Sequence, residues 1–330
     1  KAAAEDTTVT YHRNLATYYL NRREYARAIA ELEEANRREK LPKTYAMIAE
    51  SLDALGRKRE AMAALEEGWK EVARGMEADS ILWYVQLAVE TGDAARGRRF
   101  LEEHREDRKE SSAILDAAEG RLAEAEGRRM EAETLYEKAL RVDPTLVATA
   151  RQLIGFYREE GRMEEIRPVL EAGLRKSERI DEYHNLLGAL DSRAGRKEEA
   201  LAHFRRAADL NPLDARFSLN LGLTLMDLDR WEEAGAVIEK AAAATPDAEL
   251  YLGLGNVRLR TREPERALLA FQKAREMEGP GSSRADLGIA LAYLGLRRPD
   301  DALAFARESL ARNPDNPPLQ NLYQDLLQRK

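Results

Sequence analysis

Residues 181–212, DEYHNLLGALDSRAGRKEEALAHFRRAADLNP, predict two short amphipathic helices joined by a tight turn. Leu187 and Leu190 belong to an apolar stripe at helical spacing in the first half. Gly195 follows, and a glycine at the end of a helix adopts a left-handed cap without strain. Pro212 ends the second helix because proline cannot continue one. The stretch therefore predicts a helix hairpin whose apolar side must pack against other segments of the chain.

The same pattern returns about every 34 residues along the chain. The spacing is clearest at Gly188, Gly222, Gly255 and Gly288, which lie 34, 33 and 33 residues apart. Hairpins of this period bury their apolar sides by stacking on one another, so no single central core is needed. We therefore predict an all-α solenoid of antiparallel helix pairs.

The opening stretch resembles a tetratricopeptide repeat (TPR). The residues that match the family pattern are His184, Leu187, Gly188, Gly195, Ala200, Phe204, Ala207 and Pro212. Asp191 replaces the tyrosine of that pattern. The resemblance implies a right-handed superhelix in which the first helix of each repeat lines a concave face that binds protein segments.

Three parts are expected along the chain. Residues 1–8 are predicted to be a tail or linker, residues 9–314 a solenoid of about nine repeats, and residues 315–330 a C-terminal capping helix. The capping helix is predicted from an apolar stripe that includes Leu319 and Leu326, because terminal repeats must cover the last apolar face. The first residue is Lys1, which we interpret as a sign of processing or of a longer protein.

Two segments depart from the repeat pattern. Residues 102–110, EEHREDRKE, close the weakest repeat and are predicted to be a solvated helix face and exit loop. Residues 295–301, GLRRPDD, are predicted to form a turn two residues longer than the others, beginning at Gly295.

Composition excludes several classes of function. The net charge is −7, which is unfavourable for binding nucleic-acid phosphates, and we predict no nucleic-acid partner. No apolar run has the 18 or so residues that a membrane span needs, so no membrane insertion is expected. The chain has no cysteine, which removes thiolate chemistry and leaves the compartment undetermined.

No catalytic or cofactor motif is found. The four histidines lack the His-x-x-x-His spacing that offers two ligands from one helix, so we predict that they pack within the repeats. No phosphate-binding glycine loop or nucleophile elbow is present. The sequence predicts a protein that is not an enzyme and carries no cofactor or metal.

The candidate binding site is the concave face implied by the resemblance. The polar residues placed there in repeats five to eight are Arg151, Arg158, Asn185, Arg193, Arg216, Asn220, Asn256 and Arg260. Guanidinium groups bind carboxylates bidentately and asparagine amides pair with peptide backbone, so the ligand is expected to be an acidic or extended segment. The set is loosely similar to the carboxylate-clamp TPRs, although their earlier lysine–asparagine pair is missing. In the first four repeats the lining is mixed, with Arg13 and Trp83 among it, and it predicts no particular ligand.

Three functions remain open at this point. The first is a non-catalytic scaffold that binds a protein segment on the concave face. The second is the repeat portion of a larger enzyme or assembly protein, such as one exported from a bacterium. The third is a homo-oligomer, a filament subunit that joins head to tail through the solenoid ends, because a contact of that kind does not close.

Overall fold

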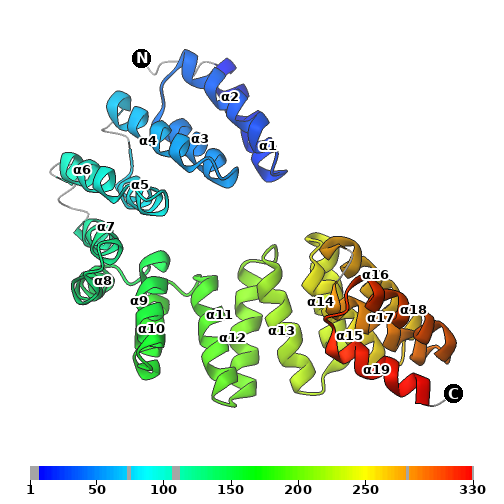
Figure 1. Ribbon diagram of the computed structural model, residues 1–330. Helices are drawn as coiled ribbons and strands as arrows, with labels where there is room; N and C mark the ends of the chain where they lie inside the picture. The colour runs from blue at the N-terminus through cyan, green and yellow to red at the C-terminus, as the bar shows by residue number, and fades with distance from the viewer. Residues whose placement is uncertain (1–6, 73–75, 106–111, 280–281, 329–330) are drawn as a thin grey trace. The chain divides into compact units, whose positions relative to one another are not determined.

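A computed structural model describes residues 7–72, 76–105, 112–279 and 282–328. Within these residues the regular structure is helical throughout, without a strand, and the predicted all-α class is confirmed. The chain divides into two compact units, an N-terminal unit of Lys1–Val169 and a C-terminal unit of Leu170–Lys330. In Figure 1 the helices of each unit follow one another in the order of the sequence.

The N-terminal unit contains four complete helix pairs and the start of a fifth. Its helices are α1 Thr7–Asn21, α2 Tyr25–Arg38, α3 Pro42–Ala54, α4 Lys58–Val72, α5 Asp79–Glu90, α6 Ala94–Arg105, α7 Ser112–Ala125, α8 Arg129–Val142, α9 Val147–Glu159 and the short 3₁₀ helix η3 Met163–Glu165. Helix α10, Ile166–Lys176, contains the boundary between the units.

The C-terminal unit contains four further pairs and a last single helix. These helices are α11 Asp181–Arg193, α12 Lys197–Leu210, α13 Ala215–Asp227, α14 Trp231–Ala244, α15 Ala248–Arg260, α16 Pro264–Glu278, α17 Ser283–Gly295, α18 Pro299–Arg312 and α19 Pro317–Gln328. We call the odd-numbered member of each pair its first helix and the even-numbered member its second helix.

One turn geometry joins the two helices of a pair. In the turn after α11, Gly195 has a φ of 75°, and the next residue, Arg196, donates its backbone N–H to the carbonyl of Asp191 at 2.9 Å. This left-handed residue closes the C-terminal end of the first helix. Among the described residues nine turns carry such a residue, namely Arg23, Gly56, Gly92, Gly127, Gly161, Gly195, Asp229, Arg262 and Arg297. They recur every 33 to 36 residues, which confirms the repeat period.

Small residues allow the two helices of a pair to approach closely. A Cβ atom added at Gly188 of α11 would lie 2.8 Å from a ring carbon of Phe204 on α12. At Gly255 the same addition would lie 2.5 Å from the ring of Phe271. The large residue on the second helix therefore occupies the space that the glycine leaves on the first.

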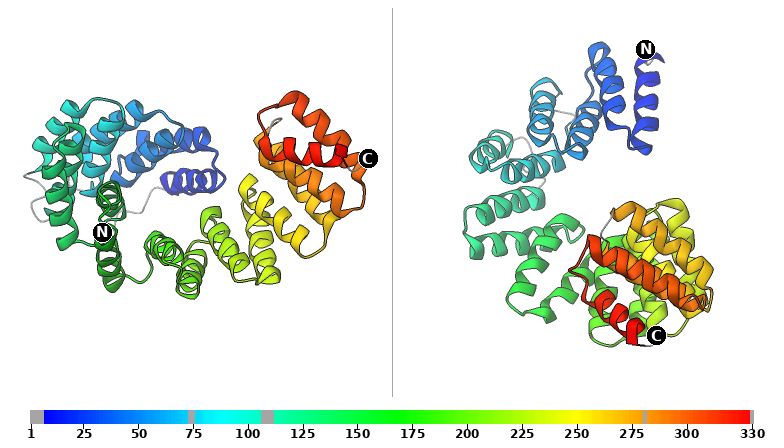
Figure 2. Two further views of the ribbon diagram at one scale, coloured as in Figure 1. Left: turned by 60° about the horizontal axis from the view of Figure 1, so that its bottom comes forward. Right: turned by 45° about the vertical axis from the view of Figure 1, so that its right-hand side comes forward.

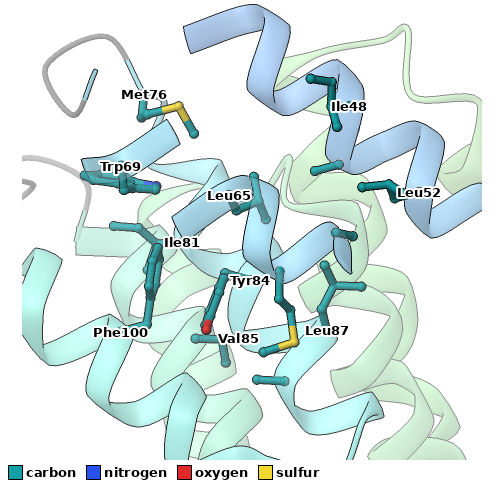
Figure 3. Close-up of a cluster of buried hydrophobic side chains, with 14 of the residues drawn as sticks. Ile48, Leu52, Leu65, Trp69, Met76, Ile81, Tyr84, Val85, Leu87 and Phe100 are labelled. Carbon is teal, nitrogen blue, oxygen red and sulfur yellow. The ribbon is translucent and has the colours of Figure 1, made fainter. Parts of the chain in front are cut away.

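Apolar side chains from consecutive pairs form the core of the N-terminal unit. Figure 3 shows Trp69 of α4 beside Ile81 of α5, with Tyr84 of α5 and Phe100 of α6 in the same cluster. The rings of Tyr84 and Phe100 stack with their centroids 3.8 Å apart. The Trp69 indole N–H donates to Ser80 Oγ at 2.9 Å, so its polar atom is satisfied inside the cluster. The core thus runs along the pairs instead of filling one centre.

Helix α19 covers the last pair of the C-terminal unit. It packs on α17 and α18, and it is the red helix at the C-terminus in both views of Figure 2. Leu319 is fully buried and Leu326 is 6% exposed, whereas Leu327 is 43% exposed. The helix therefore buries one apolar stripe and leaves its other side in solvent.

Two predicted boundaries need correction. Helix α1 begins at Thr7, inside the predicted tail, and residues 1–6 lie outside the described residues. The predicted long turn at 295–301 is wrong, because α17 continues through Gly295 and α18 starts at Pro299. The left-handed residue there is Arg297, which forms the ordinary three-residue turn. The predicted exit loop after Arg105 lies outside the described residues.

Candidate functional site

An open groove of about 790 Å³ crosses the first helices of the first three pairs. Its walls combine apolar side chains with charged ones. The lining residues are Arg13, Leu41, Pro42, Lys43, Ala46, Met47, Glu50, Met76, Glu77, Asp79, Ser80 and Trp83. The first helices of three consecutive pairs, α1, α3 and α5, therefore build one surface together with the residues just before α3 and α5.

Charges of both signs border this groove. The Nε atom of Arg13 is buried, and no hydrogen-bond acceptor for it lies among the described residues. Burial raises the pKa of Asp79, and the nearby carboxylates of Glu77 and Asp143 add to the rise. The groove thus has a guanidinium that could bind a carboxylate, and an acidic border that could bind a cation.

The eight predicted groove residues divide between the two units. Arg151 and Arg158 lie on α9 of the N-terminal unit. The other six lie on three first helices of the C-terminal unit, with Asn185 and Arg193 on α11, Arg216 and Asn220 on α13, and Asn256 and Arg260 on α15. The six residues on α11, α13 and α15 are therefore the ones that belong to one unit and can form one surface.

Asn185 and Asn220 are brought together across neighbouring first helices. The Nδ2 atom of Asn220 donates to Oδ1 of Asn185 at 2.8 Å. This bond uses one donor and one acceptor, so further donors and acceptors of both amides stay unused by it. The pair is a polar contact between the first helices α11 and α13.

Arg216 and Arg260, two of the predicted arginines, contact other side chains of the protein. Arg216 Nη2 lies 2.6 Å from Asp214 Oδ2 and 3.5 Å from Glu182 Oε2. The hydrogen bond from Arg216 holds the pKa of Asp214 below its usual value. The guanidinium of Arg260 lies 5.3 Å from the ring centroid of Trp231. An acidic ligand at Arg216 would have to compete with these carboxylates.

The structure also brings together two histidines whose sequence spacing did not predict a contact. His184 on α11 and His203 on α12 place their Nδ1 atoms 3.2 Å from each other. Burial lowers the pKa of His184, and the nearby His203 and Arg206 lower it further, against the bond to the Glu178 carbonyl. The spacing of ligand pairs within one helix does not predict this contact, because the two residues lie 19 apart on two helices.

The described residues contain no group of three or more His, Cys, Asp or Glu side chains placed to hold a metal ion. Nor does any described helix combine the length and the apolar character that crossing a membrane requires.

Comparison with known proteins gives one matching family model and several solved structures with a similar fold. The sequence profile of the tetratricopeptide repeat matches residues 185–249 and 252–317, which span most of α11 to α18. No curated protein sequence matches the chain.

Solved structures are similar at low sequence identity. A chain of the APC/C hetero-tetramer Cut9-Hcn1 is 18% identical with a TM-score of 0.56, and the match covers 92% of this chain and 59% of that one. The structure of pilF from Pseudomonas aeruginosa is 19% identical with a TM-score of 0.52, over 67% of this chain and 99% of that one. At these identities the likeness concerns the fold alone.

The profile match and the repeated turn identify the same repeating helix pair. The profile covers the four pairs from α11 to α18, and the left-handed turn that joins those pairs also joins the pairs of the N-terminal unit. Residues 185–317 therefore carry tetratricopeptide repeats, and the N-terminal unit has the same turn geometry.

Proposed function

We propose that the protein is a non-catalytic scaffold that binds a segment of another protein on the first helices of its pairs. The observation that carries the proposal is the groove across α1, α3 and α5, with its volume of about 790 Å³. Ligand sites of roughly 300–1,000 Å³ combine apolar walls with a few polar groups that fix orientation. Met47, Met76 and Trp83 supply such walls here.

The groove favours a ligand with an apolar side chain and one carboxylate. A methionine surface adapts to different apolar side chains, because the thioether is flexible and polarisable. A ligand carboxylate beside Arg13 would supply the acceptor that its buried Nε lacks among the described residues. Glu50, Glu77 and Asp79 also line the groove, so a uniformly acidic tail would be repelled along much of it.

A second peptide segment could bind to the first helices of the C-terminal unit. There the Asn185–Asn220 pair offers amide groups to the backbone of an extended segment. Arg193 and Asn256 are exposed on the same set of first helices. The acidic character expected from the sequence is less favoured here, because Arg216 is already paired with Asp214.

A peptide selection tests the proposal on the groove. A random peptide library displayed on phage would be selected on the full chain, and the affinity of the enriched peptides measured by fluorescence anisotropy. We expect an enriched pattern of an apolar residue near an acidic one. Met47→Glu should weaken binding at least tenfold, because it places a charge in the apolar wall.

Met130→Glu is the matched control. Met130 is 85% exposed on α8 and does not line the groove, so this variant should bind as the wild type does. Arg13→Ala should weaken acidic peptides and leave their amide analogues unchanged. Equal binding by the wild type and Met47→Glu would reject the groove as the site. An Arg216/Asn220/Asn256 triple alanine variant tests the C-terminal unit. Unchanged affinity of this variant for the selected peptides would remove the C-terminal unit from the proposal.

A further inference from the structure

The charged side chains of the groove across α1, α3 and α5 are distributed unevenly. The two positive ones are Arg13 on α1 and Lys43 in the first turn of α3. The three negative ones come later in the chain, with Glu50 farther along α3, Glu77 just before α5 and Asp79 at the first residue of α5. Lys43 and Glu50 are seven residues apart, which separates their positions by about 10 Å along the axis of α3. The groove therefore has a positive side at α1 and a negative side at α5.

These five charges are available to a ligand. No ion pair joins any of them to another residue that the structure describes. Elsewhere in the same unit charged side chains are paired, as Lys40 is with Glu71 at 2.7 Å and Arg57 with Glu60 at 2.6 Å. A ligand with charges of the opposite sign can therefore pair with the groove without first breaking an ion pair of the protein.

The negative side of the groove favours a basic side chain. Asp79 and Trp83 are four residues apart on α5, so they lie on the same face of the helix. Burial raises the pKa of Asp79, and the carboxylates of Glu77 and Asp143 raise it further. A positive charge from a ligand would relieve this repulsion, and a cation over the Trp83 indole would gain cation–π attraction as well. We therefore expect a lysine or arginine of the ligand at this side.

We propose that the groove selects segments that carry an acidic, an apolar and a basic residue in this order from α1 to α5. The acidic residue pairs with Arg13 and Lys43, and the apolar residue packs on Met47. The basic residue pairs with Glu77 and Asp79. Helix α3 lies between α1 and α5 in Figure 1. A helix is about 10 Å across and an extended chain advances about 3.3 Å per residue, so the two ligand charges should be about three residues apart or more.

Peptide selection on charge-reversed variants tests this order, which rests on the proposed function because it presupposes a peptide in the groove. The same phage library would be selected on the wild type, on Asp79→Lys and on Arg13→Glu. The wild type should enrich an acidic and a basic residue on opposite sides of an apolar one. Asp79→Lys should enrich peptides in which only the basic residue is replaced by an acidic one. Arg13→Glu should enrich peptides in which only the acidic residue is replaced by a basic one.

A control and a folding check accompany the selection. Glu102→Lys is the matched control, because Glu102 is exposed on α6 and does not line the groove, and it should enrich the wild-type pattern. Circular dichroism at 222 nm checks that each variant is helical. If Arg13→Glu is not, Lys43→Glu replaces it, since Lys43 is exposed.

Affinities of one synthetic peptide provide a second readout. A fluorescein-labelled peptide of the wild-type pattern, with its basic residue changed to glutamate, should bind the wild type at least tenfold more weakly than the parent peptide. Asp79→Lys should restore its affinity. Peptides that depend on Met47 but show the same charge pattern on the wild type and both reversed variants would overturn the order of charges and leave the proposed function standing. A selection without any peptide sensitive to Met47→Glu would overturn both.

Discussion

Individual glycines in this chain have opposite roles, which substitution can separate. Gly255 of α15 faces the Phe271 ring, and an added Cβ would lie 2.5 Å from it, whereas Gly155 of α9 has no atom within 4 Å of such a Cβ. Gly255→Ala should therefore destabilise the protein by about 1–3 kcal/mol through overpacking. Gly155→Ala should stabilise it by up to about 1 kcal/mol through helix propensity. Urea denaturation measures both, and a shift of the same sign in the two variants would contradict the packing described.

The carboxylate of Glu66 makes stability depend on pH. Arg96 donates to it from Nε at 2.8 Å and from Nη2 at 2.7 Å, and the Tyr84 hydroxyl also donates to it. Burial alone would raise the pKa of Glu66, but these bonds outweigh burial and hold the pKa below its usual value. A carboxyl group with a lowered pKa stabilises the fold above its unfolded pKa of about 4.3, and this contribution is lost as the pH falls through the folded pKa.

Glu66→Gln should therefore lower the melting temperature at pH 7. The difference from the wild type should shrink as the pH falls below about 4.3, because the carboxyl group of the unfolded chain takes up a proton there. Thermal melts across this range provide the measurement. A difference that stays constant down to pH 3 would show that the carboxylate charge is not what stabilises this contact.

Among the helices, α19 offers the clearest comparison of a buried and an exposed position. Leu319→Ala removes a fully buried side chain that packs on the preceding pair, and should cost about 2–5 kcal/mol. Leu327→Ala on the same helix removes a side chain that is 43% exposed, and should change the free energy of unfolding by about 0.5 kcal/mol or less. Equal losses in chemical denaturation would mean that α19 does not cover the last pair as described.

Most of the helices could be predicted from the sequence, because glycine and proline mark their ends. Gly195 and Pro212 bracket α12 in this way. The turn after α17 could not be predicted so easily, because Arg297 adopts the left-handed conformation that glycine adopts elsewhere. The pattern predicts a turn that begins at Gly295, but this residue is helical, and an added Cβ there would lie 2.9 Å from Pro264.

The candidate sites were harder to predict than the helices, because they combine residues from several elements. The first-helix positions singled out Arg13 and Trp83, but the groove also needs Met76, which precedes α5. His184 and His203 meet only because α11 and α12 pack together. The residue pattern of a single helix does not predict contacts between side chains of different helices.

Among the described residues of each unit, the main packing joins helices that are near neighbours in the chain. The substantial contacts within the units link helices no more than two apart. A solenoid of this kind has no shared core, so damage to one pair should stay local. Phe271→Ala should therefore raise amide hydrogen exchange in α15 to α17, and should leave α1 to α4 as protected as in the wild type. Uniform loss of protection along the chain in hydrogen-exchange mass spectrometry would contradict this.

The central claim is that a protein segment binds on the first helices of the N-terminal unit, and methionine methyl NMR tests it most directly. The chain has seven methionines, of which Met47 and Met76 line the groove. With ¹³C-methyl methionine, saturation with a selected peptide should shift the signals of Met47 and Met76 and leave those of Met130, Met226 and Met277 in place. Shifts confined to the other methionines, with Met47 and Met76 unchanged, would contradict the account.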